Sequence, residues 1–536
     1  MHRFVLLDDW FLTARERGNP ATDVDRRRGD GKAWTEGNGV QVLVDGAEYF
    51  PRLYEVLSAR QRGDWVHFTD WEGDPDERLA GPGTEVGRVF ADLARRGVQV
   101  RGLVWRSHPR RAHYFEQQNA RLVREINESG GEVVLDERVR RGGCHHQKFV
   151  VVGHASASDD DVAFVGGIDL CHGRNDDGRH EGDPQAVDLE SRYGDRPPWH
   201  GIQLQLHGPA VGDVAHTFRE RWEDPTPFDH RNPLRIVLRH LTGQPRHSGE
   251  LPPVPRDPAP AGPHAVQIIR TYPAKRLRYP FAPDGERSIG HAYRKALRRA
   301  RRLVYVEEQY LWGQEWADAM AGALRREPEL RLIVVVPRFT ARSGLVARNA
   351  ENIGRARVIQ TLRDAGGNRA AFYDLENASG TPIYMHAKVC VIDDVWLKVG
   401  SDNLNRRSWT HDSELSCAVL DTTYDEREPL DPGGLGDHAR VLPRETRLRL
   451  WREHLGREDV ADLIDPAAGF ESWQAAATAL DNWHDGGREG PRPPGHVRFH
   501  RPESVPERHR WWLHTMHQLF VDPDGRPRHL RRPDHS

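Results

Sequence analysis

The sequence predicts an α/β protein made of two copies of one unit, each a mostly parallel or mixed sheet covered by helices. Three observations lead to this fold class. Amphipathic helical segments alternate with short apolar strands. The same order of segments occurs in both halves of the 536 residues, and a stretch rich in Pro and Gly separates the halves.

The first predicted helix has a stripe at i, i+3, i+4 and i+7, and the matching helix of the second half has the same kind of stripe. The stripe residues are Phe50, Leu53, Tyr54 and Leu57 in the first half and Ile289, Tyr293, Ala296, Leu297 and Ala300 in the second. A predicted strand follows each helix, over residues 65–71 and 303–312. The duplication is therefore visible from the first element.

The following elements also correspond in pairs. A helix and a strand are predicted within residues 85–105 and again within 316–337. A third helix ends at Gly130-Gly131 in one half and at Gly366-Gly367 in the other, because glycine commonly ends helices. The strands "EVVLD" and "AAFYDL" come next. Each half then reaches a His-x-Lys tripeptide, a buried strand, a turn and a Gly-rich strand end.

These observations predict four segments along the chain. Residues 1–242 form the first domain, 243–264 a Pro/Gly-rich linker, 265–483 the second domain, and 484–536 a polar C-terminal tail. The tail looks unpacked, except that its apolar patch Trp511, Trp512 and Leu513 could dock it on the body.

Composition excludes several classes of protein. Lys+Arg number 77 against 80 Asp+Glu, which argues against a broad basic surface for nucleic acid. Four cysteines in a chain of this length do not make a disulfide scaffold. The N-terminus lacks a signal peptide, and no window approaches the ~18 apolar residues of a membrane span. We expect a soluble, reduced, cytoplasmic protein whose contact with a membrane is peripheral.

The strongest functional signal is the duplicated His-x-Lys, His146/Lys148 and His386/Lys388. The chain has six lysines, so two such tripeptides at equivalent places of a repeat are far from chance. On a strand, side chains i and i+2 point the same way, which would put His and Lys on one face. A zinc site at Cys144, His145 and His146 is disfavoured because ligands this close in sequence rarely share one metal.

In its motifs the chain resembles the phospholipase D superfamily, in the branch with two motifs in one chain. The second motif reads H-x-K-x4-D followed by G-S-x-N, with Asp393, Gly400, Ser401 and Asn403. Flanking segments extend the resemblance: "DWVHFTDWEGDPDERL", "AFVGGIDLCHGR", "LVYVEEQYL" and "SDNLNRRSWTHDSEL". The resemblance implies two duplicated α/β/α sandwich domains related by a pseudo-twofold axis, with one active site at their interface. It also implies a monomer that needs no cofactor and no metal.

The family's chemistry suggests a role for each motif residue. A phosphodiester resists attack until its oxygens are neutralised, which Lys148 and Lys388 could do with hydrogen bonds from Ser401 and Asn403. By resemblance we expect His146 to attack phosphorus and His386 to act as acid and base. Further expectations are that Glu414 orients His386, while Asp393, Asp169, Gly167 and Gly400 support the site. Trp71, Tyr310 and Trp312 could be core residues or walls for the substrate.

The first copy departs from the pattern at two positions. Gly153 stands where the second copy has Asp393, and the following Asp159, Asp160 or Asp161 could substitute. Gly201 stands where relatives tend to have an acid, which we expect to be the partner of the nucleophile's second ring nitrogen. Asp188, Glu190 or a backbone carbonyl could replace that acid. Alternatively the roles are swapped, and His386, oriented by Glu414, attacks.

The function expected from the resemblance is hydrolysis of the headgroup phosphodiester of a glycerophospholipid, giving phosphatidate and a free alcohol through a phosphohistidine. Transfer to another alcohol, transphosphatidylation, would share the intermediate. Alternatives are a phosphodiesterase for nucleic acid or another diester, a cardiolipin-synthase-like transferase, and a degenerate member that binds lipid with little turnover. Nucleic acid is disfavoured by the near-neutral charge.

Overall fold

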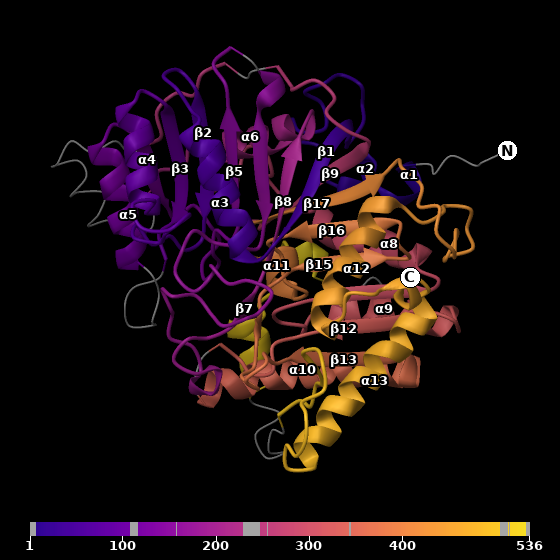
Figure 1. Ribbon diagram of the computed structural model, residues 1–536. Coiled ribbons are helices and arrows are strands. Elements are labelled where there is room, and N and C mark those ends of the chain that lie inside the picture. Colours follow the sequence, from indigo (N-terminus) through magenta and orange to yellow (C-terminus); the bar gives the residue numbers. More distant parts are fainter. Residues whose placement is uncertain are drawn as a thin grey trace.

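A computed structural model describes residues 7–107, 116–156, 158–228, 247–253, 256–341, 345–503, 513 and 515–531. Within these ranges one large sheet runs through the whole molecule, and both halves of the chain contribute to it (Figure 1). Residues 243–246 and 254–255 of the predicted linker, and Trp511 and Trp512, lie outside the described ranges.

The order of strands in this sheet shows the duplication directly. From the seam outward, the first half gives β1 (Thr35–Val44), β8 (Ile202–His207), β6 (Val162–Gly166), β5 (Phe149–Gly153), β2 (Trp65–Asp70), β3 (Gln99–Trp105) and β4 (Glu132–Asp136). The second half gives β9 (His264–Tyr272), β17 (Glu414–Asp421), β16 (Trp396–Gly400), β15 (Val389–Ile392), β11 (Leu303–Glu307), β12 (Arg331–Val335) and β13 (Ala370–Leu375). Each strand of the first half has its counterpart at the same place in the second series, so that β1 corresponds to β9, β8 to β17, and β4 to β13.

The halves meet where β1 pairs antiparallel with β9. In each half the three outer strands are parallel to one another, and the inner strands are antiparallel, so each half has a mixed sheet. A short outermost strand, β18 (Val497–Phe499), is added beyond β13, and β10 (Glu286–Arg287) pairs with β9. Outside this sheet, β7 (Trp199–His200) of the first half pairs with β14 (Tyr384–Met385) of the second.

The helices repeat in the same order as the strands. In the first half they are α3 (Asp45–Ser58), α4 (Val86–Arg95), α5 (Glu116–Glu128) and α6 (Ala210–Trp222). Their counterparts are α8 (Ser288–Arg299), α9 (Gln314–Arg326), α10 (Leu345–Gly366) and α12 (Val441–Leu455). Further helices are α1 (Leu7–Trp10), α2 (Ala14–Arg17), α11 (Arg406–Thr410) and α13 (Pro466–Asp485).

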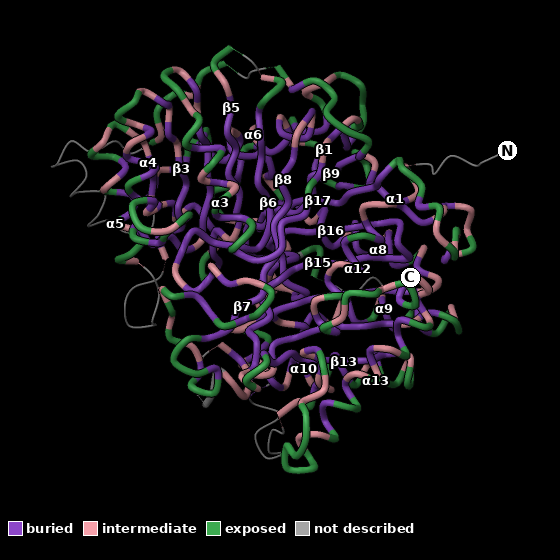
Figure 2. Tube along the Cα trace, viewed as in Figure 1, coloured by how far each residue is buried: buried purple, intermediate pink, exposed green. Residues whose placement is uncertain are grey.

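Helices cover both faces of the sheet, and the buried side chains form a core on each face. One face has a separate core in each half, beneath α3, α4 and α5 and beneath α8 and α9. On the other face a single core continues across the seam, from Val214 of α6 to Trp451 of α12. The buried trace in Figure 2 accordingly runs along the central strands, and exposed residues gather in the outer loops and helices. The predicted duplicated α/β/α fold is confirmed.

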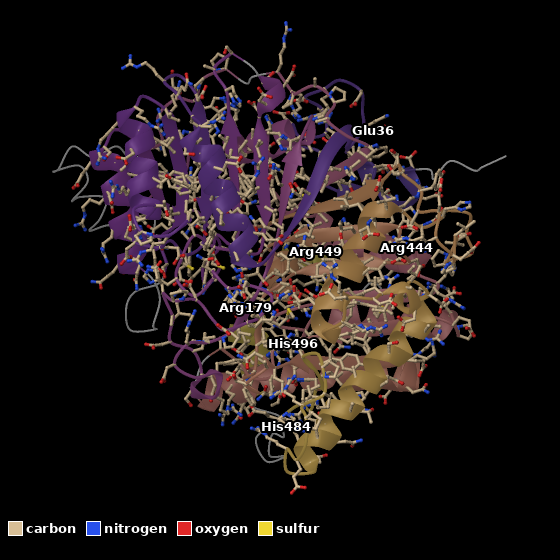
Figure 3. All side chains as sticks on the ribbon, viewed as in Figure 1. Glu36, Arg179, Arg444, Arg449, His484 and His496 are labelled. Carbon is tan, nitrogen blue, oxygen red and sulfur yellow. The ribbon has the colours of Figure 1, made fainter. Side chains whose placement is uncertain are left out.

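Contacts between the halves are polar as well as apolar. The Arg449 side chain of α12 (Figure 3) reaches the first half, where Nη1 donates to the backbone oxygen of Val42 at 3.2 Å. Its Nη2 pairs with the Glu48 carboxylate of α3. Because α12 belongs to the second half, these contacts help to hold it across the seam.

Two parts of the chain differ from the sequence prediction. The strand predicted over 303–312 ends at Glu307, and Gln309 in the residues that follow contacts the motif lysine Lys388. The segment predicted as an unpacked tail also contacts the body. Its strand β18 extends the sheet, and Leu513 is buried. No helix among the described residues is long and apolar enough to cross a membrane.

Candidate active site

The two His-x-Lys segments lie at equivalent places just ahead of β5 and β15. The sequence predicts them inside strands, but residues 146–148 and 386–388 lie outside strands and end where β5 and β15 begin. In both copies the lysine Nζ donates to the backbone oxygen of its own histidine, at 3.1 Å for Lys148 and 2.5 Å for Lys388. His and Lys of each copy are therefore held together locally.

Each motif is docked on the opposite half of the molecule. The backbone N–H of His146 donates to Ser413 O at 2.9 Å, and that of His386 donates to His200 O at 2.8 Å. The flanking backbone repeats this exchange, through the bridge between His145 and Ser413 and the β7–β14 pair. The site is therefore built at the interface of the halves.

Glu414 orients His146, whereas the sequence reading assigned it to His386. His146 Nδ1 lies 2.9 Å from Glu414 Oε2. When Nδ1 donates its proton to that carboxylate, Nε2 keeps the lone pair that a nucleophile needs. Burial lowers the pKa of His146 well below its usual value, and Lys148 lowers it further. His146 is thus a neutral, oriented imidazole.

The pseudo-twofold relation explains this correction. The N–H of Ser401 donates to Leu415 O at 3.0 Å, and the equivalent N–H of Gly167 donates to Ile202 O at 3.1 Å. Leu415 therefore corresponds to Ile202, and the residue before each, Glu414, corresponds to Gly201. Since Glu414 reaches the histidine of the opposite half, the acid absent at Gly201 is the missing partner of His386.

His386 accordingly has no carboxylate partner within the described chain. Its Nδ1 is buried and makes no hydrogen bond to any described residue. The ring packs on Trp199, with centroids 4.8 Å apart. Neither proposed substitute acid reaches it, because Asp188 is exposed and Glu190 binds Arg192 Nε at 2.8 Å. Burial lowers the pKa of His386 well below its usual value. The positive charges of Lys388 and Arg174 lower it further.

The two lysines differ in their partners. Lys148 Nζ lies 3.4 Å from Asp169 Oδ1 and 5.5 Å from the centre of the Trp71 ring, a cation–π contact. Lys388 Nζ donates to Gln309 Oε1 at 3.0 Å. Burial lowers the pKa of Lys388 to about 7, although the nearby Glu308 opposes this shift. Trp71 also packs edge-on against His146 at 5.7 Å, so it forms part of the wall of the site.

The Gly-Ser-x-Asn segment, residues 400–403, helps to position the histidine and lysine side chains of the site. Ser401 Oγ donates to Glu414 Oε2 at 2.5 Å, so its hydrogen positions the acid and does not face a phosphate oxygen as expected. Asn403 is buried, and its Oδ1 has no partner among the described residues. A Cβ at Gly167 would lie 3.2 Å from Lys388 Cδ, and one at Gly400 would lie 1.8 Å from Ser416 Oγ. The glycines therefore make room for the lysine and for the neighbouring strand.

Asp393 stabilises the scaffold and does not touch the motif groups. Its carboxylate accepts the N–H groups of Arg301, Arg302 and Leu303, which enter β11. At the equivalent Gly153, the Trp65 ring occupies the place of a side chain, since a Cβ would lie 2.0 Å from Trp65 Cε2.

Asp159 and Asp161, in the acidic run after Gly153, do not restore the missing carboxylate. Asp161 accepts the N–H of His154 at 2.8 Å, and Asp159 accepts the N–H of Ala259 at 2.9 Å. Asp161 therefore stabilises its own loop, and Asp159 ties that loop to the neighbouring segment around Ala259.

Two further residues, Arg174 and Gln309, contribute to the site and were not predicted. The Arg174 guanidinium lies over Trp199 at 4.0 Å and donates to Glu72 Oε2 at 3.0 Å. Gln309 holds Lys388. The segments "GGIDLCHGR" and "VEEQY" contain Arg174 and Gln309, but their spacing gave no reason to select these positions. The Cys144 thiol is buried, and no group of potential metal ligands among the described residues includes Cys144, His145 or His146.

Comparisons with known proteins agree with this geometry. A family model described as "Phospholipase D" matches residues 75–233, and one described as "Cardiolipin synthase, PLD-like domain" matches residues 293–427. Each match therefore contains one His-x-Lys segment. Together with the curated relatives, they support a phosphodiester hydrolase.

Two curated relatives are plant proteins. "Phospholipase D alpha 1" of Oryza sativa subsp. japonica is 27% identical over 83% of this chain and 68% of its own length. "Phospholipase D alpha 1" of Ricinus communis is 26% identical over 74% of this chain and 62% of its own. The chain spans about two thirds of the length of these relatives. Among solved structures, phosphatidylserine synthase of Haemophilus influenzae Rd KW20 covers 82% of this chain and 93% of its own, with 12% identity and a TM-score of 0.49.

Proposed function

The chain belongs to the phospholipase D superfamily, and from this premise we propose that it cleaves the headgroup phosphodiester of glycerophospholipids through a phosphohistidine on His146. The observation that supports this most is the buried His146–Glu414 pair, assembled from opposite halves and accompanied by Lys148. Neutrality, orientation and nearby positive charge are what a histidine nucleophile for an anionic diester requires.

The reaction proceeds in two displacements. Nε2 of His146 attacks phosphorus while the bond to the headgroup oxygen breaks, and protonated His386 gives its proton to the leaving alkoxide. His386 then takes a proton from water, whose oxygen attacks phosphorus and releases His146 and phosphatidate. An alcohol in place of that water gives the transphosphatidylation product. The chain's own groups complete both steps without a metal.

His386 must gain a proton before the first step, and the substrate favours this. The low pKa of free His386 results from burial and from the positive charges of Lys388 and Arg174. A bound phosphodiester brings a negative charge against those cations, which favours the imidazolium. The same anion favours the charged form of Lys388, whose pKa burial lowers.

The glycerophospholipid assignment is supported by the relatives named phospholipase D, which align over 74–83% of this chain. One chain contains both motifs, so a monomer is sufficient. We infer peripheral contact with the lipid surface, and co-sedimentation with phosphatidylcholine vesicles tests it directly.

Choline release from phosphatidylcholine vesicles tests the activity. We expect turnover by the wild type and none by His146→Ala or His386→Ala, while His484→Ala on α13 keeps wild-type turnover. Brief reaction with a phosphate-labelled lipid, acid quenching and peptide mapping should find the label on His146. Label on His386 would contradict the assignment of the nucleophile.

A second candidate is a lipid-binding member with little turnover. The observation that favours it is the buried, unpartnered Nδ1 of His386. A screen over phospholipids, nucleic acids and simple diesters separates the cases. Vesicle binding without product over long incubation would support the second candidate, and turnover of another diester would change the substrate class.

A further inference from the structure

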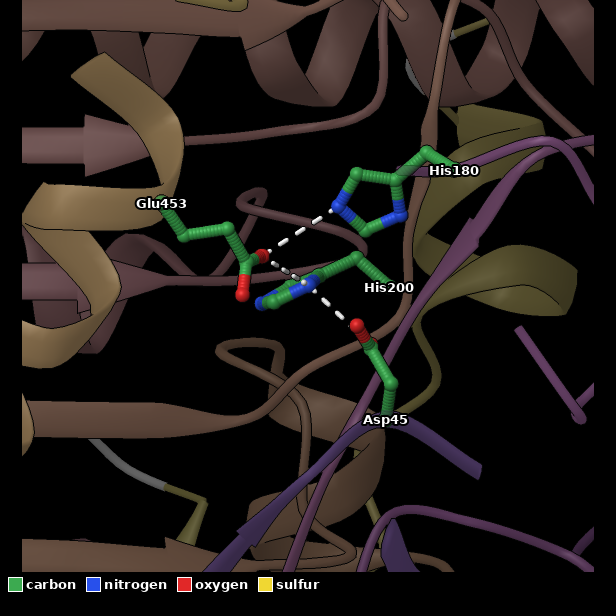
Figure 4. A group of neighbouring side chains, drawn as sticks. All are labelled: Asp45, His180, His200 and Glu453. Carbon is green, nitrogen blue, oxygen red and sulfur yellow. Dashed lines mark hydrogen bonds and ion pairs between the residues drawn. The ribbon is translucent and has the colours of Figure 1, made fainter. Parts of the chain in front are cut away.

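A second cluster of buried polar side chains lies behind the catalytic histidines. Asp45 begins α3, His180 lies in a loop of the first half, His200 is in β7, and Glu453 belongs to α12 (Figure 4). Both histidines are fully buried, and the Asp45 and Glu453 side chains are 3% and 18% exposed. One ligand atom from each residue lies within 4.8 Å of all the others.

The spacing of these atoms matches a tetrahedral metal site. His200 Nδ1 is 3.1 Å from Asp45 Oδ1 and 3.4 Å from Glu453 Oε1, which is 3.2 Å from His180 Nε2. Zinc binds nitrogen and oxygen at about 2.0–2.2 Å, so two ligands at a tetrahedral angle are roughly 3.3–3.5 Å apart. These three separations are close to that range, and the remaining pairs of ligand atoms lie within 4.8 Å of each other.

The outer contacts of both histidines fix the tautomers that a metal requires. His180 Nδ1 lies 3.1 Å from Trp199 O, and His200 Nε2 lies 3.1 Å from Glu307 Oε2. Histidine ligands typically donate their other ring N–H to a carbonyl or carboxylate, which directs the lone pair at the metal. Glu307 is itself held by Tyr305 and His454. These outer contacts are an observation separate from the spacing of the four ligand atoms, and they also indicate a metal ion.

Charge and ligand type select the ion. Two carboxylates and two neutral imidazoles balance a divalent cation. His200 Nδ1 is buried and lies within ion-pair distance of the Asp45 and Glu453 carboxylates, at 3.1 and 3.4 Å, without a hydrogen bond of good geometry to a described residue. Imidazole nitrogen favours zinc and its neighbours over calcium or magnesium. A proton is the competing occupant. Burial lowers the pKa of His200, but Asp45 and Glu307 raise it well above the usual value when no metal is present.

We propose that Asp45, His180, His200 and Glu453 bind one Zn²⁺ in a structural site. All four positions are filled by protein, so the metal has no open position for substrate. It joins the first half to α12 and fixes His200, whose backbone oxygen accepts the N–H of His386 at 2.8 Å. The metal thus positions the second catalytic histidine without taking part in the reaction.

Elemental analysis of the tag-free protein tests the site independently of any activity. Protein grown with added zinc and purified in chelator-treated buffer should contain about one zinc per chain, as a closed four-ligand site predicts. After removal of zinc, cobalt should bind in the same ratio and give the intense visible absorption of tetrahedral Co²⁺. Wild-type protein that holds no stoichiometric metal after incubation with Zn²⁺ would overturn the proposal. So would nitrogen NMR showing both ring nitrogens of His200 protonated in that sample.

Two variants locate the metal. His180→Gln and Glu453→Gln should lose most of the zinc, whereas His484→Gln should keep it, because His484 pairs with Glu376 and Arg488, which are not among the four proposed ligands. If either cluster variant fails to fold, the wild-type metal content and the cobalt spectrum still decide the matter. Full zinc occupancy in both folded variants would exclude this site.

Discussion

Gly201→Glu should give His386 the orienting acid that it lacks. Position 201 corresponds to Glu414 across the pseudo-twofold relation, and Glu414 reaches the histidine of the opposite half. Gly201 does not adopt a positive φ, so a side chain is compatible with its backbone. A Cβ there would lie 3.0 Å from Ile168 Cγ1 and 3.8 Å from Trp199 Nε1. The new side chain would therefore enter the space beside the Trp199 ring, on which His386 packs.

The expected gain follows from the strength of a charged hydrogen bond. Such a bond contributes about 1.5–3 kcal/mol, which corresponds to a rise in kcat of about 10- to 100-fold when it stabilises the imidazolium that protonates the leaving group. The added carboxylate also raises the pKa of His386 in the substrate complex, so the alkaline limb of the kcat profile should move to higher pH. Crowding against Ile168 costs about 1–3 kcal/mol of stability.

Steady-state choline release measures this effect, with thermal unfolding of the same samples. Gly201→Gln is the matched control, because it brings the same bulk without the charge and should gain little. Adding Ile168→Val to the glutamate variant relieves crowding if that variant alone is unstable. A folded Gly201→Glu protein with unchanged or lower kcat, and with an unshifted pH profile, would refute the pairing of position 201 with His386.

The other predictions test single features of the site. In the first step, release of the leaving group, His386→Ala should lose far less rate on a diester with an acidic aryl leaving group than on phosphatidylcholine, because such a group departs without a proton; equal losses in that step would contradict the acid role. The kcat/KM should fall as pH rises through about 7, where Lys388 loses its proton, and Glu308→Gln should start this fall at lower pH because Glu308 raises the pKa of Lys388. An unshifted profile in Glu308→Gln would exclude Lys388 as the titrating group. Gly153→Asp should destabilise the protein by ~1–3 kcal/mol or more in urea unfolding, since its Cβ would overlap the Trp65 ring.

The duplication and the motif pairs could be predicted from sequence because their signals are local. Helical stripes, apolar strands and the spacing of His and Lys are all properties of short windows, and the structure has them in the predicted order. The packing of the C-terminal tail, residues 484–536, was harder to predict from the sequence. Its strand β18 has three residues and an arginine at its centre, as suits an exposed sheet edge, so it lacks the apolar run that predicts a strand.

The partner of each histidine could not be read from the sequence, because the contact crosses between the halves. Glu414 is 268 positions from His146, and the second-half motif is much nearer in sequence. Assigning the acid to the histidine of its own half was therefore the natural error. Only the exchange of backbone contacts around Ser413 and His200 shows that each half completes the site of the other.

That exchange changes the meaning of the departure at Gly201. If the acid at position 201 had oriented the nucleophile, its loss would slow the attack on phosphorus. In the structure, His146, the nucleophile that we propose, is instead paired with Glu414, and it is His386 whose Nδ1 has no partner among the described residues. Under the role that we propose for His386, protonation of the leaving group, the deficit in the first step should grow with the basicity of that group and vanish when the group needs no proton. An asymmetric pair of histidines on a symmetric backbone therefore predicts a selectivity for leaving groups, whatever the headgroup proves to be.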